Sequence, residues 1–551
     1  MTSLPSSVLH IRVDEYYVAA WAGALAPVVH LACNRHEPNI LLAIASLFFS
    51  ILCLFAALIY AGQSFWYSLL LTNVASTSFA ITLFTSISIY RLFLSPLCNF
   101  PGPNLAAISK LWYIYHSVGG GMPKVVRELH EKYGDIVRIG PDELSVRSMD
   151  AVEVILGSKG RMNKGSWYDA MWADKGGRSV HALKSVDEHA QRRKIWDKAM
   201  SGSAVKEYVV FLKDCLTRLC HRLQEDYKSN PVQDVRRVMN HLIFDIIGEI
   251  TCSRSFGMIE NGEDHTYIDF IERGMRALTC IAEIPWIIPL LTLLPVVKAQ
   301  TEAEEFSMKA TMDRYKKGWS RPDLFSYFVQ DDGQLQPGMT MKDLDADVRA
   351  AIMAGSDTSA TTLTFIFEFL SQHPKWTRQL REEVDARHLG DGDFDLDNAP
   401  ILDAIVNETL RVRPTVPARS QRVVPAGGIS ISGHYIPGGT LIGIPPPLIM
   451  QDPRNFSPDP TIWRPQRWLQ PEKEETFRRS AFIPFSYGPF NCSGKALGLL
   501  VVRYSVARLV HEFDVSAAQE HDSKVFERSI KEYLSVQKGP FWAVVRPRNV
   551  N

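Results

Sequence analysis

Uncharged apolar segments dominate the first hundred residues of the chain. Ile40–Gly62 runs for 23 residues without a charged side chain, which is enough for a helix to cross a hydrocarbon core of about 30 Å. Phe65–Tyr90 is also uncharged, although it is richer in Ser and Thr, and Tyr16–Cys33 is a shorter apolar stretch. The pattern predicts a membrane anchor over residues 1–98, with spans at about 40–62 and 65–90, and it leaves a third span at 16–33 open.

The few charges around these segments indicate their orientation. Arg35 and His36 precede the second apolar segment and Arg91 follows the third, whereas the connecting Gln63–Ser64 is uncharged. Because cationic residues near the ends of spans favour the cytoplasmic side, we expect the C-terminal part of the chain to face the cytoplasm. A cleaved signal peptide fits poorly, because no basic segment precedes the longest apolar run.

Beyond residue 104 the apolar positions repeat mainly at helical spacing. Strand-like segments are short and no internal linker divides the chain, so we predict one mainly α-helical domain with small β-sheets over residues 99–551. The predicted helices include Met122–Tyr133, Asp187–Met200, Ala204–Tyr227 and Val232–Ile250, and the predicted strands include Ile136–Ile139, Leu144–Arg147, Ile429–Ile431 and Tyr435–Ile436.

One apolar segment inside this domain needs a separate explanation. Ile284–Val297 is 14 residues long and contains Pro285, Pro289 and Pro295, so it is too short and too interrupted to span a bilayer. It belongs either to the core or to a loop that dips into the membrane surface and lines a hydrophobic substrate entrance.

Charge and cysteine content narrow the function classes. The 60 Lys and Arg residues balance 60 Asp and Glu residues, whereas nucleic-acid binding needs a cationic excess, so we expect no nucleic-acid partner. The eight cysteines show no zinc-type spacing, and a cytoplasmic domain keeps its thiols reduced. A cysteine with a chemical role should therefore be recognisable by its neighbours.

Cys492 has such neighbours. It lies in the loop Phe485-Ser-Tyr-Gly-Pro-Phe-Asn-Cys492-Ser-Gly494, directly before an apolar segment at helical spacing. The positive end of a helix dipole and free backbone N–H groups favour a thiolate, which is the form of cysteine that binds metals. Gly488 and Gly494 lack Cβ atoms and would let a bulky planar cofactor approach the sulfur. A buried structural cysteine is the alternative interpretation.

This loop resembles the haem-binding loop of the cytochrome P450 family, in particular of fungal microsomal members with a multi-span N-terminal anchor. The resemblance implies haem b (iron protoporphyrin IX) with Cys492 as the axial iron ligand. Glu408-Thr-Leu-Arg411 matches the E-x-x-R pair of the family, and Trp463-Arg-Pro-Gln-Arg467 resembles the later loop that supplies the third member of its buried ion-pair network. Without that context, Glu408 and Arg411 would be a weak surface pair.

A further motif lies in a segment predicted to be helical from about Thr340 to Leu370. Ala354-Gly355-Ser-Asp357-Thr358 matches the A-G-x-D-T segment that crosses above the haem in this family. The resemblance implies that Gly355 leaves space for dioxygen, that Thr358 hydrogen-bonds the iron-bound oxygen and that Asp357 feeds the proton relay that splits the O–O bond. A helix-interior threonine bonded to a backbone carbonyl is the alternative for Thr358.

The haem loop departs from the family pattern at one position. Phe490 stands where the family usually has an Arg or His that pairs with a haem propionate. By the same resemblance, His189, Arg193 and Arg419 are the candidates to bind the propionates instead, and each of them could also be a solvated surface residue. Gln466 replaces the more usual Glu, but Arg467 is retained.

The resemblance implies a monooxygenase in the endoplasmic reticulum membrane that inserts one oxygen atom from O2 into a hydrophobic substrate. No G-x-G-x-x-G fingerprint is found, so we expect electrons from a separate NADPH–cytochrome P450 reductase that docks on basic residues. The alternatives are an O2-independent haem-thiolate isomerase or dehydratase, against which the Asp357–Thr358 pair argues, and a non-catalytic membrane haem-binding protein. The proposed docking residues are Arg192, Lys194, Lys198 and Lys495.

We expect a hydrophobic substrate, such as a terpenoid, a fatty acyl chain or a polycyclic aromatic compound, because the segments expected to line the site are mainly apolar and aromatic. These segments are residues 161–188, 251–297, 351–358 and 415–418, and their large aromatic residues are Trp167, Tyr168, Trp172 and Trp286.

Overall fold

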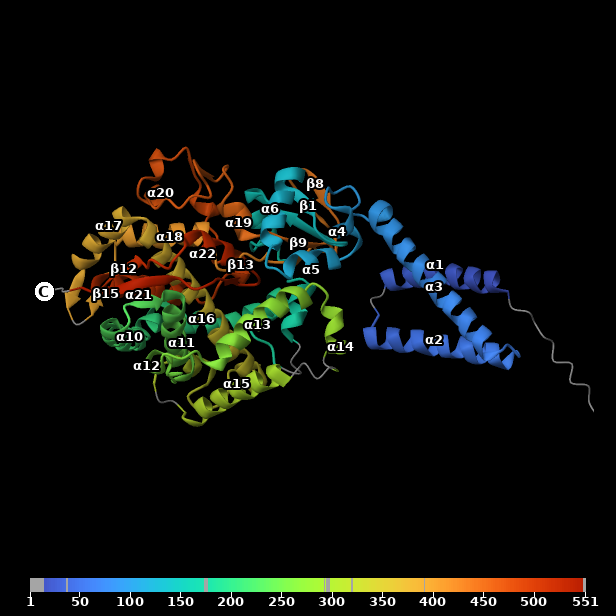
Figure 1. The fold of residues 1–551 in the computed structure, drawn as a ribbon, viewed down its shortest axis with the longest axis horizontal. Coiled ribbons are helices and arrows are strands. Elements are labelled where there is room, and N and C mark those ends of the chain that lie inside the picture. The colour runs from blue at the N-terminus through green and yellow to red at the C-terminus, as the bar shows by residue number, and fades with distance from the viewer. Residues whose placement is uncertain are drawn as a thin grey trace, which may run out of the picture.

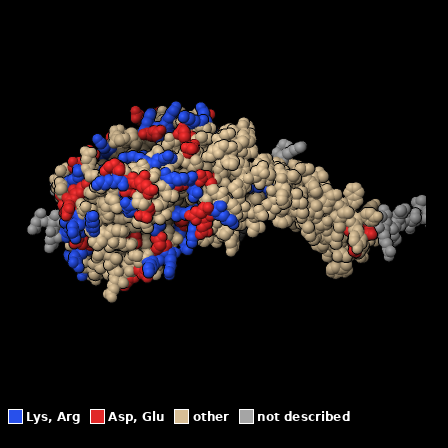
Figure 2. All heavy atoms as spheres, turned by 90° about the horizontal axis from the view of Figure 1, so that it is seen from above, with Lys and Arg blue, Asp and Glu red and all other residues tan. Residues whose placement is uncertain are grey.

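The computed structural model describes residues 14–35, 38–172, 177–291, 293, 298–318, 321–390 and 392–548. Three helices at the N-terminus extend away from a mainly helical domain that holds the rest of the chain (Figure 1). Charged side chains cover the visible face of the domain and are nearly absent from the visible face of the extension (Figure 2). The mainly α-helical class predicted from the sequence is confirmed.

Each of the three N-terminal helices is long and apolar enough to cross a membrane: α1 (Glu15–Arg35), α2 (Ile40–Tyr60) and α3 (Phe65–Ile89). The segment left open as a third span is therefore a helix like the other two. It packs against α3 through small and polar residues: a Cβ atom at Gly23 would lie 3.2 Å from Ser78 Oγ, and His30 Nδ1 lies 2.9 Å from Ser86 Oγ. Small residues and interhelical hydrogen bonds are what hold helices together in lipid.

Arginine hydrogen bonds connect these three helices to the domain. Arg138 donates from Nη1 to the carbonyl of Arg91, 2.8 Å away at the end of α3, and from Nη2 to the carbonyl of Pro141 at 2.6 Å. Arg91 in turn donates to the carbonyl of Ile108. Both arginines therefore satisfy backbone carbonyls at the junction, which fixes where the apolar helices leave the domain.

The helices of the domain surround one large apolar core built mainly from α10, α11, α16, α18 and α21. The first half contains α4 (Asn104–Ile108), α5 (Leu111–Ser117), α6 (Met122–Tyr133), α7 (Met149–Ile155), α8 (Val186–Ala199), α9 (Gly202–Glu207), α10 (Val209–Ser229), α11 (Val235–Cys252) and α12 (Met258–Asn261). The second half contains α13 (Thr266–Ile281), α14 (Ile288–Leu291), α15 (Lys298–Lys316), α16 (Met341–Gln372), α17 (Pro374–Asp385), α18 (Pro400–Val412), α19 (Pro446–Met450), α20 (Gln466–Leu469), α21 (Lys495–Glu512) and α22 (Ser523–Ser529).

Two helix predictions were wrong in detail. The expected helix over 204–227 is divided at Tyr208 into α9 and α10, and the expected helix over 232–250 begins with the strand β3 (Val232–Asp234) before α11. Val232 and Gln233 join a strand near the C-terminus of the chain, so a long-range pairing overrides the local helical pattern there. Such a pairing leaves no signal in the local spacing of apolar residues.

The sheets are small and stand at the edges of the helical core. The largest has the order β1 (Ile136–Arg138), β2 (Glu143–Val146), β9 (Leu441–Gly443), β6 (Arg422–Val423), and a second has the order β12 (Phe513–Ala517), β15 (Trp542–Pro547), β3. Two-stranded pairs join β4 (His388–Gly390) to β5 (Asp393–Phe394), β7 (Ile429–Ile431) to β8 (His434–Ile436), β10 (Phe456–Ser457) to β11 (Thr476–Phe477) and β13 (Lys531–Glu532) to β14 (Val536–Gln537).

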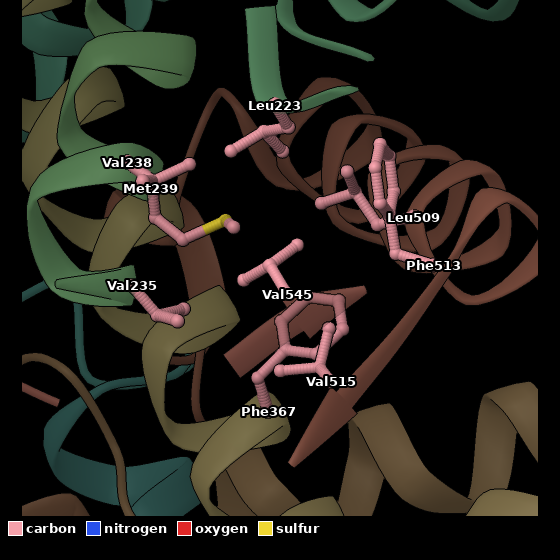
Figure 3. Close-up of a pocket in the computed structure, with 9 residues that line it drawn as sticks. All are labelled: Leu223, Val235, Val238, Met239, Phe367, Leu509, Phe513, Val515 and Val545. Carbon is pink, nitrogen blue, oxygen red and sulfur yellow. The ribbon is translucent and has the colours of Figure 1, made fainter. Parts of the chain in front are cut away.

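The core is tightly packed. The cavity that Figure 3 shows between α10, α11, α16, α21 and the sheet of β12 and β15 has a volume of only about 10 Å³ and an entirely apolar lining. That volume is at the lower limit for a single water molecule. This cavity is therefore a packing defect and cannot hold an organic substrate.

The close contact of α11 with the loop that follows it yields a stability prediction. A Cβ atom at Gly248 would lie 2.5 Å from the carbonyl oxygen of Arg254 and from the ring of Phe256, whereas one at Gly274, in the middle of α13, would meet no atom within 4 Å. We expect Gly248→Ala to lower the free energy of unfolding by about 1–3 kcal/mol through overpacking. The control Gly274→Ala should raise it by about 0.5–1 kcal/mol, because alanine has the higher helix propensity.

Thermal unfolding in detergent, followed by circular dichroism, measures both changes. A Gly248→Ala variant with a Tm equal to or above that of the wild type would contradict the packing described here.

Candidate functional site

The loop that carries Cys492 is held in a fixed shape by backbone hydrogen bonds. The Cys492 N–H donates to the carbonyl of Phe485 at 2.9 Å, and the Asn491 N–H donates to the carbonyl of Gly488 at 3.0 Å. Gly488 has a φ of 72°, and a Cβ atom there would lie 2.0 Å from the carbonyl oxygen of Leu156. Only glycine fits at this position, so the approach of the loop to α7 is built into the sequence.

The side chain of Cys492 is exposed, yet surrounding protein atoms influence its thiol. It exposes a large part of its surface, yet burial among the surrounding protein atoms raises the pKa of its thiol, against the opposing effects of the Gly494 N–H group, Arg193 and Lys495. The two observations agree if the sulfur borders a hollow inside the protein. His181 shows the same combination. Its side chain has a large accessible surface, yet burial among the surrounding protein atoms lowers the pKa of its ring to about 3.

The middle of α16 also has an open face. Ala354 is exposed although the positions on either side of it are buried or half-buried, and the hydroxyl of the half-buried Thr358 donates to the Ala354 carbonyl at 2.7 Å. Thr358 therefore makes the helix-interior bond expected of an ordinary threonine, while its oxygen keeps lone pairs free to accept. Gly355 packs against α11, since a Cβ atom there would lie 3.0 Å from Cδ1 of Ile247.

Asp357 lies in a different electrostatic environment from Thr358. Burial raises the pKa of its carboxyl group, and the attraction of Lys538 opposes that shift. Lys538 donates from Nζ to Oγ1 of Thr361, one turn further along α16, at 2.8 Å, and burial lowers the pKa of this amine to about 8. Sequence reasoning could not find Lys538, because it lies 181 positions after Asp357 in a segment without a motif.

Glu408, Arg411 and Arg467 form one buried ionic network. Arg411 binds both carboxylate oxygens of Glu408 at 2.8 Å, and Arg467 donates from Nε to Oε1 of Glu408 at 2.9 Å. All three side chains are fully buried, and Trp468 donates its indole N–H to the same carboxylate at 2.9 Å. Removing one member of such a network leaves an uncompensated buried charge, at a cost of about 3–5 kcal/mol.

Phe490 packs among two buried cationic side chains and a buried histidine. Lys164 Nζ is 4.6 Å and the Arg422 guanidinium 4.7 Å from the centroid of its ring, and the His189 ring centroid is 4.5 Å away. Lys164 and Arg422 face each other across a β-bridge. The position that departs from the family pattern is therefore surrounded by cations from other segments.

This cluster has no anion to balance it within the part of the chain that the structure describes. Lys164 donates only to the carbonyl of His181, at 2.7 Å, and Arg422 only to its neighbour's carbonyl. Burial and the nearby Arg422 and Arg193 lower the pKa of Lys164 far below its usual range, and burial with Lys164 lowers that of His189 to about 3. Buried charges without partners are costly, so the cluster fits an anionic ligand.

Arg193 and Arg419, the other two residues expected at the propionates, differ in their surroundings. Arg193 donates to the carbonyl oxygen of Asn491 at 2.7 Å, beside Cys492, and to Asp197 at 2.6 Å. Arg419 instead binds Glu283 at 2.8 Å and contacts Glu143. Its charge is already balanced, so the expected propionate role of Arg419 is not supported, and Arg422, three residues later, faces the cation cluster instead.

The expected docking face and substrate lining also need revision. Arg192 is buried and pairs with Asp347 at 2.8 Å, so it cannot contact a partner, whereas Lys194, Lys198 and Lys495 are exposed.

Among the aromatic residues expected to line the substrate site, Tyr168 is buried, Trp167 is half-buried and Trp286 is 47% exposed. The side chain of Trp172 and parts of the lining segments, residues 173–176, 292 and 294–297, lie outside the described residues.

Residues 101–542 match the family described as Cytochrome P450. The chain is 31% identical to the cytochrome P450 monooxygenase FCK2 of Fusarium pseudograminearum, over 91% of both chains. It is 30% identical to the tryprostatin B 6-hydroxylase of Aspergillus fumigatus, over 91% of both chains, and 31% identical to the averantin hydroxylase of Dothistroma septosporum, over 86% of this chain and 91% of the relative.

The chain thus belongs to the cytochrome P450 family, a class of haem-thiolate monooxygenases, and its curated relatives are fungal enzymes. The residues present fit haem. Cys492 presents an exposed sulfur at the end of its glycine loop, and Lys164 and Arg422 beside Phe490 offer positive charge to propionates.

Because Lys164 has no anionic partner among the described residues, replacing it should have opposite effects on the stability of the haem-free protein and on the retention of haem. We expect Lys164→Met to stabilise the haem-free protein, because a buried cation without a partner is removed. The same change should speed the loss of haem about ten-fold, because a hydrogen-bonded charge at a propionate is worth about 1.5–3 kcal/mol. The exposed Lys159 provides the matched control, Lys159→Met.

Haem transfer to excess apomyoglobin and unfolding of the haem-free protein measure the two effects. Unchanged haem loss in Lys164→Met would remove Lys164 from the propionate site.

Proposed function

We propose that this cytochrome P450 hydroxylates a hydrophobic compound of secondary metabolism, such as a terpenoid or a polycyclic aromatic, at the membrane of the endoplasmic reticulum. The observation that carries the proposal is the exposed Cys492 in its hydrogen-bonded glycine loop, beside the cations Lys164 and Arg422, which have no carboxylate partner among the described residues. Haem, when bound by Cys492, supplies the activation of dioxygen. The names of two relatives support hydroxylation as the reaction, since these proteins are named as hydroxylases of tryprostatin B and averantin.

The residues of α16 would manage protons in this reaction. Thr358 presents its oxygen to the open face of the helix, where it can hold a water molecule or a polar group by accepting a hydrogen bond. Asp357 has a raised pKa because it is buried, so it can take up and release protons nearer neutral pH than an ordinary carboxyl group. We assign proton delivery to this pair, and the open position Ala354 to substrate or oxygen.

Electrons would arrive from a separate NADPH–cytochrome P450 reductase. Lys194 and Lys198 on α8 and Lys495 at the start of α21 are exposed, and α8 also carries Arg193, which binds the Cys492 loop. A negatively charged partner that docks on these lysines would therefore approach the haem from the side of its cysteine ligand.

Ligation by Cys492 is tested by the carbon monoxide difference spectrum of the reduced, membrane-expressed protein. We expect a Soret band shifted to long wavelength in the wild type and in the control Cys98→Ser. Cys492→Ser should lose that band, because a serine hydroxyl does not replace a thiolate as electron donor. An unshifted band in the wild type would refute the haem-thiolate assignment.

The proton-delivery role predicts uncoupling in Thr358→Ala. We expect NADPH consumption to continue while the product formed per NADPH falls about ten-fold or more, within the range of general acid–base effects. Thr364→Ala is the matched control, because Thr364 makes the same hydrogen bond, to the Ala360 carbonyl at 2.8 Å, in a buried part of α16.

Equal coupling in the wild type and Thr358→Ala would exclude Thr358 from the mechanism. Product formation without any O2 consumption in the wild type would instead favour an isomerase or dehydratase.

A further inference from the structure

A second buried ionic cluster lies away from Cys492, at the end of α13. Arg419 binds both carboxylate oxygens of Glu283, at 3.0 and 2.8 Å, and contacts the Glu143 carboxylate and the Tyr113 hydroxyl. Lys110 contacts Glu143 and lies 3.4 Å from Glu283. Two carboxylates and two cations thus form one balanced group, which we call the Glu283 cluster.

The Glu283 cluster joins segments that are far apart in the sequence. Lys110 and Tyr113 belong to the start of α5, Glu143 begins β2, and Arg419 lies in the segment between α18 and β6. The side chains of Glu143, Glu283 and Arg419 are at most 5% exposed. Of the cluster residues named here, only Glu283 comes from the segment that joins α13 to α14.

Glu283 stands where the chain bends sharply. Helix α13 and the short helical segment Pro285–Leu291 meet at an angle of 109° on either side of it. The segment after the bend is apolar and packs against α2 of the anchor, and Figure 1 shows α14 between the domain and α2. The predicted apolar segment therefore lies at the membrane-facing end of the domain, and its described part is not in the core.

Helix α13 connects this bend to the proposed reaction site. Glu272, in the middle of α13, is close enough to Asp357 and Lys538 for their charges to influence its carboxyl group. The same helix contacts α5 and the turn over residues 166–172, next to the proposed lining. A tilt of α13 away from α5 would therefore open a route from the anchor side towards Asp357.

The outer face of α5 is apolar although its inner face holds the cluster. Leu111, Tyr115 and Val118 are 64%, 78% and 64% exposed, and Trp286 beyond the bend is 47% exposed. Exposed apolar side chains on both sides of the Glu283 cluster suit contact with lipid. An apolar compound dissolved in the membrane would meet this face first.

We propose that the Glu283 cluster is a latch that closes the substrate entrance at the membrane, and that entry of a lipophilic substrate requires Glu283 to separate from Arg419 and Lys110. The inference rests on the proposed function, since it concerns the substrate of that site. The latch consists of strong charge-assisted hydrogen bonds in a buried setting, so the closed state dominates. The rate of substrate entry is then proportional to the small fraction of open molecules.

The test compares Glu283→Gln with the wild type as the full-length haem protein in vesicles of neutral lipid. The variant keeps the shape of the side chain but leaves Arg419 and Lys110 with one carboxylate. We expect the association rate of a lipophilic ligand, followed by the change in the haem spectrum on mixing, to rise about ten-fold as the open fraction rises. Hydrogen exchange of residues 268–291 should accelerate in parallel, without any ligand.

Two further variants make the result decisive. Glu263→Gln changes an exposed glutamate just before α13 and should leave both measurements at the wild-type values. If Glu283→Gln does not fold, Lys110→Gln combined with Glu283→Gln restores the balance of one anion and one cation, and it should show the same faster entry.

Equal association rates and equal hydrogen exchange in the wild type and a folded Glu283 variant would overturn the latch. A failure of the proposed function is distinguishable, because it would appear as a wild-type protein without the long-wavelength carbon monoxide band. The exchange experiment still reports on the latch in that case, since it needs neither ligand nor turnover.

Discussion

The carboxylate of Glu408 is the point on which the arrangement of the site depends. It accepts hydrogen bonds from Arg411 on its own helix and from Arg467, Trp468 and the Arg464 backbone of a segment more than fifty residues later. That later segment precedes the Cys492 loop in the chain, with β11 between them. Because Glu408 binds two buried arginines and Glu474 completes the charge balance, neither segment can move without exposing an unpaired charge to an apolar core. The network therefore fixes the cysteine loop against the central helices.

The Glu408 network, the Glu283 cluster and the group around Phe490 are all buried, but they differ in their charge balance. The Glu408 network gains a second carboxylate, Glu474, which binds Arg467 at 3.0 Å. The Glu283 cluster pairs two carboxylates with two cations. The group around Phe490 has cations and, among the described residues, no carboxylate at Lys164 or Arg422. Balanced groups hold segments together, whereas an unbalanced buried group fits a ligand of opposite charge.

The anchor and the domain are arranged so that their apolar surfaces meet. Arg91 and Arg138 fix the exit of α3 from the domain, and α14 rests against α2. The exposed apolar face of α5 lies on the same segment as Lys110 and Tyr113. The exposed apolar face of α5 and the proposed latch therefore lie on neighbouring residues.

The sequence by itself determined what is local: the apolar lengths of α2 and α3, the Cys492 loop with its obligatory glycine, the helix that carries Thr358, and the E-x-x-R spacing that places Glu408 and Arg411 on one helical face. Only the tertiary structure decided which cations surround Phe490, that Arg419 is bound by Glu283 and Glu143, that Arg192 is buried, and that Lys538 faces Asp357. The reason is physical. Helical spacing and turn chemistry act over a few residues, whereas a charge is satisfied by whichever segment folding brings within about 4 Å.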